Sequence, residues 1–235
     1  MKIKFFLFIG ALTVLLLGSH LFLNRVGSNI SEDDLMAINL IKEMLDCNQV
    51  NSFIDEIECI NSVQKATLSI VSSDPCPTHD CCPLKGETIE PIIFIKRGWG
   101  CCFDRARFNE KILNNYGFET RRVFLIEKKY LPIFNFLPLN QSSHAATEVK
   151  TSYGWMGVDS NSNTKLINYK TNQVYSYRKA LSERPHEIEL VPEYMFINKP
   201  SVIYGLHSRH GTSYKPNIPG PEFNLNEIKY NFLGD

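Results

Sequence analysis

The sequence predicts an α+β fold preceded by one N-terminal transmembrane or signal segment. Three observations lead to this prediction. Residues 31–71 repeat apolar side chains at helical spacing, and residues 121–159 contain short runs typical of strands. An uncharged apolar run, residues 5–23, opens the chain. We therefore expect helices in the N-terminal half and an antiparallel sheet packed against a later helix.

The composition is that of an ordinary globular protein. The 235 residues include 25 basic and 25 acidic side chains, so the formal net charge is zero, and 43% of the residues are hydrophobic. These proportions exclude a disordered chain, a fibrous repeat and a polytopic membrane protein. The neutral charge balance removes the main electrostatic reason to expect nucleic acid as a partner. One domain is expected at this length, and the seven cysteines form an odd number that cannot all pair.

The N-terminal apolar run reads as a targeting segment. Lys2 and Lys4 precede residues 5–23, which at about 1.5 Å rise per residue nearly span a bilayer core of about 30 Å. A cleaved signal peptide and an uncleaved anchor both fit this pattern. The cleavage sites near Gly18 and residues 26–28 are weak, so we favour an anchor with the lysines on the cytoplasmic side. In both cases the rest of the chain is expected to be exported, where disulfides are chemically permitted.

Two helices are expected after this segment. The first begins at Ser31, which can cap it, and the second extends over residues 51–71. Cys47 and Cys59 lie at or near the ends of these two stretches. We expect a disulfide between them that joins the helices.

The following loop, residues 72–86, contains three cysteines and a histidine among many turn-forming residues. Thiolates and imidazole are zinc ligands, so one interpretation is a zinc site. The spacing matches no standard zinc pattern, and export favours disulfides. We therefore prefer a loop held by disulfides.

A helix, a strand and a hairpin are expected in the middle of the chain. The helix extends from Cys102 to Tyr116, and Gly117 is placed to end it. Residues 121–126 read as a strand, and residues 144–150 and 155–159 read as the two strands of a hairpin.

Cys102, His144 and Asp159 are the residue types that a thiol acyltransferase needs, in a compatible arrangement. A cysteine at the first turn of a helix has its thiolate favoured by unpaired backbone N–H groups and by the helix dipole. The same N–H groups can supply part of an oxyanion hole. His144 begins one strand of the hairpin and Asp159 ends its partner, so the carboxylate can hold the imidazole in one tautomer.

This pattern resembles the core motif of the transglutaminase-like superfamily over about residues 95–162, a length judged by the extent of the motifs. That motif has a glycine two residues before the cysteine, a small residue four after it, and a glycine and an arginine about one helix later. A histidine strand and a "W-x-x-x-D" strand follow. The matching residues are Gly100, Cys102, Ala106, Gly117, Arg121, His144, Glu148, Trp155 and Asp159.

The resemblance implies a papain-like arrangement in which Cys102, His144 and Asp159 form the catalytic triad. Without the resemblance, Arg121 is most simply a structural residue paired with a carboxylate or carbonyl, and Trp155 a core residue. The expected organisation is a signal-anchor or signal peptide (1–27), a helical, cysteine-rich part (28–90), a transglutaminase-like core (91–165) and a C-terminal extension of the same domain (166–235).

The expected function is that of an exported thiol-dependent enzyme acting on amide bonds of a protein or peptide through a thioester, by hydrolysis or transamidation. This scheme requires no metal or organic cofactor. The expected membrane contact is through the N-terminal segment. The alternative is a catalytically inactive domain of the same fold that serves as a binding module in the envelope.

Cys101, which directly precedes Cys102, affects both the enzyme and the binding-module interpretation. A disulfide between Cys101 and Cys102 would silence the nucleophile, whereas pairing of Cys101 elsewhere would leave Cys102 reactive. We expect the six other cysteines to pair and Cys102 to remain a thiol.

Overall fold

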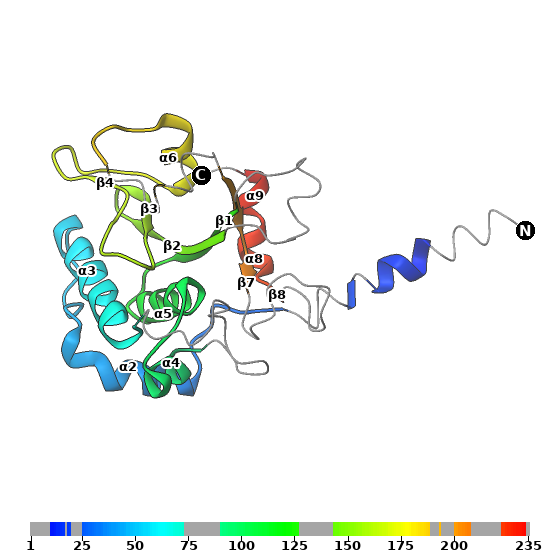
Figure 1. Ribbon diagram of the computed structural model, residues 1–235, viewed down its shortest axis with the longest axis horizontal. Coiled ribbons are helices and arrows are strands. Elements are labelled where there is room, and N and C mark those ends of the chain that lie inside the picture. The colour runs from blue at the N-terminus through cyan, green and yellow to red at the C-terminus, as the bar shows by residue number, and fades with distance from the viewer. Residues whose placement is uncertain are drawn as a thin grey trace, which may run out of the picture.

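The computed structural model describes residues 10–16, 18–19, 25–72, 90–126, 143–188, 193, 200–207 and 222–233. The fold is α+β, as predicted, with helices packed on an antiparallel sheet (Figure 1). Residues 5–9, 17 and 20–23 of the predicted apolar segment, residues 5–23, lie outside the described residues. Within the described ranges, no helix is both long enough and apolar enough to cross a membrane.

The helices between Glu32 and Asn115 lie together on one side of the sheet (Figure 1). Ser31 and Ser52 each cap a helix, and each forms a reciprocal pair of hydrogen bonds with the aspartate three residues later. Gly117, with φ of 87°, follows the last of these helices, because glycine adopts this left-handed backbone at little cost. The elements are α2 (Glu32–Ile41), η1 (Lys42–Met44), α3 (Phe53–Ile70), α4 (Pro91–Arg97) and α5 (Cys102–Asn115).

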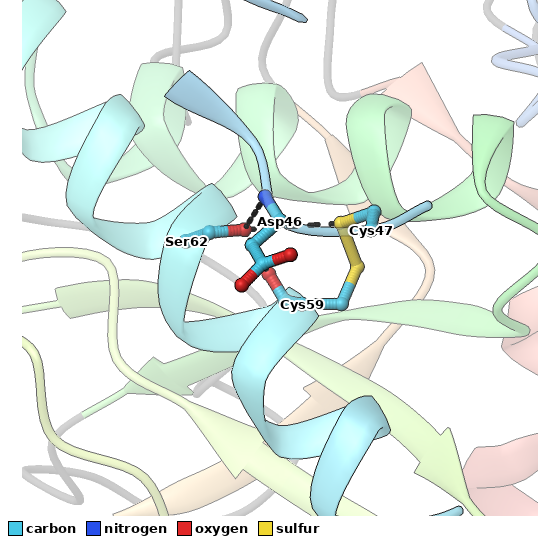
Figure 2. The surroundings of a disulfide bond; sticks show 4 residues. All are labelled: Asp46, Cys47, Cys59 and Ser62. Atoms are coloured by element: carbon cyan, nitrogen blue, oxygen red, sulfur yellow. Dashed lines mark hydrogen bonds between the residues drawn. A yellow bond between two sulfur atoms is a disulfide. The ribbon is translucent and has the colours of Figure 1, made fainter. Parts of the chain in front are cut away.

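The predicted disulfide between Cys47 and Cys59 is present and ties the chain after η1 to α3 (Figure 2). The backbone N–H of Asp46 donates to Ser62 Oγ at 2.9 Å, and that hydroxyl donates to the carbonyl of Cys59 at 2.8 Å. Cys59 is fully buried. The disulfide and the serine together hold the segment after η1 against α3.

The central sheet has the strand order β3–β2–β1–β6, and every neighbouring pair is antiparallel. The predicted strand is β1 and the predicted hairpin is β2–β3, whereas the sequence patterns did not indicate β6. Helix α5 packs against β2 and β1, so the helix that begins at Cys102 covers the strand that begins beside His144. The strands are β1 (Thr120–Ile126), β2 (Ser143–Thr151), β3 (Gly154–Val158) and β6 (Ser201–Tyr204).

Shorter elements follow the hairpin and surround the sheet (Figure 1). Two small two-stranded sheets are formed by β4 with β5 and by β7 with β8. These elements are β4 (Ile167–Asn168), β5 (Gln173–Val174), α6 (Tyr177–Glu183), β7 (Leu206–His207), β8 (Glu222–Phe223), α8 (Leu225–Ile228) and α9 (Tyr230–Leu233).

A buried ion pair joins the two central strands. Arg121 on β1 lies directly opposite Glu148 on β2, and its Nε donates to Glu148 Oε2 at 2.6 Å. Both side chains are fully buried. The other carboxylate oxygen, Oε1, accepts the backbone N–H of Tyr177 at 2.6 Å, which brings the start of α6 to the same point. This agrees with the interpretation of Arg121 as a structural residue paired with a carboxylate.

Three aromatic rings surround the Arg121 guanidinium. Its central carbon lies 4.1 Å from the ring centroid of Trp155, 4.3 Å from that of Tyr204 and 4.6 Å from that of Tyr230. These rings come from β3, β6 and α9. Because a cation is attracted to aromatic ring faces, the single arginine holds both outer strands and the last helix to the centre of the sheet.

Replacing Arg121 with methionine should lower the free energy of unfolding by about 3–5 kcal/mol, because Glu148 would become a buried charge without its partner. The matched control is Lys150→Met. Lys150 pairs with Glu119 at 3.3 Å, but its side chain is 51% exposed, and such exposed pairs contribute at most about 1 kcal/mol. Urea unfolding measures both changes. Equal losses in the two variants would contradict the role assigned to the buried pair.

Candidate active site

Helix α5 carries Cys102 as its first residue. Cys102 is a half-buried thiol that forms no disulfide. The N–H groups in the first turn of a helix lack intrahelical acceptors. Thr147 Oγ1 on β2 donates to the carbonyl of Ala106 at 2.9 Å, which fixes the first turns of α5 against the sheet. Ala106 is fully buried at this contact, which explains the small residue four positions after the cysteine.

Asp104 fixes the point at which α5 begins. Its Oδ2 accepts the backbone N–H of Cys101 at 2.9 Å and Arg97 Nη2 at 2.8 Å. Gly100 approaches this carboxylate so closely that a Cβ there would stand 2.6 Å from Asp104 Oδ2 and 2.7 Å from Val71 Cγ1. The glycine two residues before Cys102 is therefore required by packing at the helix start.

His144 and Asp159 meet in the buried part of the site. His144 Nε2 lies 2.6 Å from Asp159 Oδ1, and each residue is only 2% exposed. The other carboxylate oxygen, Oδ2, accepts the backbone N–H of Asn161 at 3.0 Å. Because Nε2 is occupied by Asp159, Nδ1 remains for the hydrogen bond between His144 and Cys102. The structure thus brings together all three residues selected from the sequence.

The hairpin register differs from the simple expectation that the two strand ends lie opposite one another. The β2–β3 ladder ends at the pair Thr147–Val158, so Asp159 is not directly across from His144. The chain bends after β3, and Ser160 Oγ donates to the carbonyl of Ala145 at 2.6 Å. This bend brings the carboxylate of Asp159 back to the imidazole.

The charge states of the buried pair are coupled. Burial disfavours the imidazolium, but the hydrogen bonds with Asp159 and Cys102 outweigh it and raise the pKa of His144 to about 9. Burial also disfavours the carboxylate, yet the hydrogen bond and charge of His144 bring the pKa of Asp159 below its usual value. At neutral pH the pair is therefore an imidazolium beside a carboxylate.

The pKa of the Cys102 thiol differs from what its position at the start of a helix led us to expect. A hydrogen bond with the Cys101 side chain, followed by burial, raises the pKa of Cys102 well above its ordinary value, and the opposing effect of His144 is smaller. This direction is opposite to the expected stabilisation of the resting thiolate. Cys101 and Cys102 are not joined to each other. The three cysteines of the predicted loop 72–86 lie outside the described residues.

Comparison with known proteins finds no matching family model, no matching curated protein and no matching solved structure.

Gln64 on α3 holds the segment that carries Asp159. It is 1% exposed, and its Nε2 lies 2.7 Å from the carbonyl oxygen of Asp159, 2.6 Å from that of Ser162 and 3.1 Å from that of Thr164. Its Oε1 accepts Lys165 Nζ at 2.9 Å. One amide side chain therefore fixes both ends of the turn after β3 and sets the position of the Asp159 backbone.

Sequence reasoning did not identify Gln64. Its contacts are made 95 or more residues away along the chain, and no local motif connects the two regions. The available signal is that Gln64 lies on the buried face of an amphipathic helix, next to Ile60 and Val63. A buried amide needs hydrogen-bond partners, so its position alone indicates a tertiary contact.

Replacing Asp159 with asparagine should lower the pKa of His144 from about 9 towards or below its ordinary value of 6.5, because burial then acts without the carboxylate. The raised pKa stabilises the wild-type fold fully below pH 6.5, and this contribution is lost as the pH rises through about 9. NMR titration of the imidazole measures the pKa, and unfolding across this pH range measures the linked stability. An unchanged pKa in the Asp159→Asn variant would contradict the pairing.

Replacing Gln64 with leucine should reduce stability by about 2–3 kcal/mol, because buried carbonyls lose their donor. It should also lower the pKa of His144, because Asp159 is no longer held in place. The control is Gln173→Leu, at an exposed position, where a change within about 0.5 kcal/mol is expected. Chemical unfolding and the NMR titration of His144 are the two measurements. A Gln64→Leu variant that is destabilised but keeps the His144 pKa would show a purely structural role.

Proposed function

We propose that this protein is an exported thiol-dependent enzyme that acts on amide bonds of a protein or peptide through an acyl-enzyme thioester. Cys102 is the nucleophile, His144 the general base and acid, and Asp159 the group that orients the imidazole. The observation that carries the proposal is the buried hydrogen bond between His144 and Asp159, with the Cys102 thiol at the first residue of α5 interacting with the same imidazole.

The first half of the reaction follows from this geometry. The neutral imidazole of His144 takes the Sγ proton of Cys102 through Nδ1, and Sγ attacks the carbonyl carbon of the amide. The negative charge passes to the carbonyl oxygen, which the N–H groups at the start of α5 can stabilise. When the C–N bond breaks, the imidazolium returns the proton to the leaving amine or ammonia, and the thioester remains.

The second half repeats the proton transfer with a new nucleophile. His144 takes a proton from water or from a second amine, which attacks the thioester carbonyl. Sγ leaves with the returned proton, and the product is a carboxylic acid or a new amide. Both hydrolysis and transamidation regenerate the same thiol, so the triad supports either reaction.

The raised pKa values set the pH dependence of this mechanism. Only the neutral imidazole accepts the proton of the thiol, and the pKa of His144 is raised to about 9. The fraction of His144 able to act as a base therefore increases as the pH rises towards 9. Activity should increase in the same direction.

The transglutaminase-like, papain-like assignment is supported by the order of the elements. A helix that begins at the cysteine is followed by antiparallel strands that supply first the histidine and then the aspartate. The Cys47–Cys59 disulfide supports export, because disulfides persist in oxidising compartments. Membrane anchoring through residues 5–23, with the domain on the non-cytoplasmic side, is part of the same proposal. Secretion or periplasmic release after cleavage is its alternative.

A second candidate function is an inactive domain of the same fold that binds a partner in the envelope. The observation that favours it is the raised pKa of Cys102, since a protonated thiol is a weak nucleophile. The two candidates differ in whether Cys102 forms a covalent intermediate.

The Cys102→Ala variant should lose at least about a thousandfold of amide-donor turnover, because no thioester can form. Ammonia or amine release, with and without an added primary amine, measures turnover and separates hydrolysis from transfer. An electrophilic thiol probe should label wild type at residue 102, and the control Cys101→Ala should keep that label. Equal labelling of wild type and Cys102→Ala, or equal turnover by both, would leave the binding module as the function.

A further inference from the structure

Arg105 lies one helical turn after Cys102, and its guanidinium reaches back to the start of α5. Residues three apart on a helix are neighbours on one face, and helical side chains point towards the N-terminus. Arg105 Nη2 donates to the carbonyl of Gly100 at 3.1 Å, two residues before the proposed nucleophile. The guanidinium is thereby held at the end of the helix where Cys102 lies.

The charge of Arg105 is not balanced within the described part of the chain. Arg105 is only 5% exposed, its Nε is buried without a hydrogen-bond partner, and no carboxylate lies within salt-bridge distance among the described residues. The two carboxylates at this end of α5 are engaged elsewhere, Asp104 with Arg97 and Asp159 with His144. Among the described residues, the Arg105 charge therefore remains without a carboxylate partner at the end of α5 that carries Cys102.

The other buried arginines of the described residues provide a comparison, because their charges are neutralised by carboxylates. Each of them in the described ranges has a glutamate partner, as a buried charge requires. The pairs are Arg107 with Glu110 at 3.0 Å, Arg121 with Glu148 at 2.5 Å and Arg122 with Glu110 at 3.8 Å. Arg105 is the exception among the described buried arginines, and its guanidinium lies at the N-terminal end of the helix carrying Cys102.

We propose that Arg105 binds a carboxylate of the amide donor, so that the preferred substrates carry a negative charge close to the amide that is attacked. The inference rests on the proposed function and names its substrate class. The fork of donors on a guanidinium matches a carboxylate, and the partial positive charge of the helix start adds to the attraction. The bound anion supplies the carboxylate partner that Arg105 lacks among the described residues.

The test compares alkylation of Cys102 by iodoacetate and by iodoacetamide at one pH. In both reactions Sγ displaces iodide and forms a carbon–sulfur bond, and the reagents differ chiefly in the charge of the carboxylate. Their rate ratio therefore cancels the thiolate fraction. The Arg105→Gln variant should lower the iodoacetate-to-iodoacetamide ratio about tenfold and leave the iodoacetamide rate nearly unchanged. Tandem mass spectrometry assigns the product to residue 102.

The control variant is Lys96→Gln, which removes an exposed positive charge on α4 and should keep the wild-type ratio. Arg105→Lys retains the charge, preserves folding if the glutamine variant does not fold, and should keep most of the preference. A wild-type ratio in Arg105→Gln would overturn the proposal. So would equal loss of both rates, or an Arg105→Lys variant that has a normal iodoacetamide rate but no preference for the anion.

Failure of the proposed function gives a separate result, in which residue 102 of the folded wild type reacts with neither reagent.

A second experiment uses matched peptide donors to distinguish the sources of the carboxylate. One pair carries glutamate or glutamine beside the attacked amide, and the other ends in a free or amidated terminus. A wild-type preference for one charged member that is lost in Arg105→Gln identifies the source. Equal turnover within both pairs would overturn the substrate class.

Discussion

The buried ion pair between Arg121 and Glu148 is the interaction on which the sheet depends. It joins the two central strands, and the aromatic rings around the guanidinium attach β3, β6 and α9 to the same point. His144 lies on the same strand as Glu148, and Asp159 directly follows the strand that carries Trp155. The relative position of the two strands that supply His144 and Asp159 therefore depends on how one buried charge is neutralised. A misplaced pair would change the distance between the imidazole and its carboxylate.

Local patterns in the sequence were sufficient to predict the elements that carry the triad. The helix beginning at Cys102, strand β1 and the β2–β3 hairpin are all present, and so is the Cys47–Cys59 disulfide. These features follow from hydrophobic periodicity, turn residues and cysteine placement, which act over short distances along the chain. Strand β6 was not predicted, because its four residues carry little periodic signal and depend on pairing with β1.

Features that depend on tertiary packing were not predictable in the same way. Gln64 acts through carbonyl groups on a distant turn, and Asp159 reaches His144 through a bend rather than a regular strand pair. The pKa of Cys102 illustrates a third case. The adjacency of Cys101 is visible in the sequence, but the hydrogen bond with the Cys101 side chain and the burial that raise this pKa depend on side-chain orientation. Whether Arg105 has a carboxylate partner likewise depends on which side chains the tertiary packing brings to it.

The aromatic rings around Arg121 also determine when the domain can fold during synthesis. Tyr204 and Tyr230 come from the C-terminal part of the chain, whereas the strands that carry Arg121 and Glu148 are made much earlier. Until these tyrosines emerge, the charged pair lacks its aromatic cover and β1 lacks one neighbouring strand. Such long-range contacts delay productive folding. A nascent chain that stays unfolded until late in translation can still pass through a membrane pore as an extended chain, which is compatible with the export proposed above.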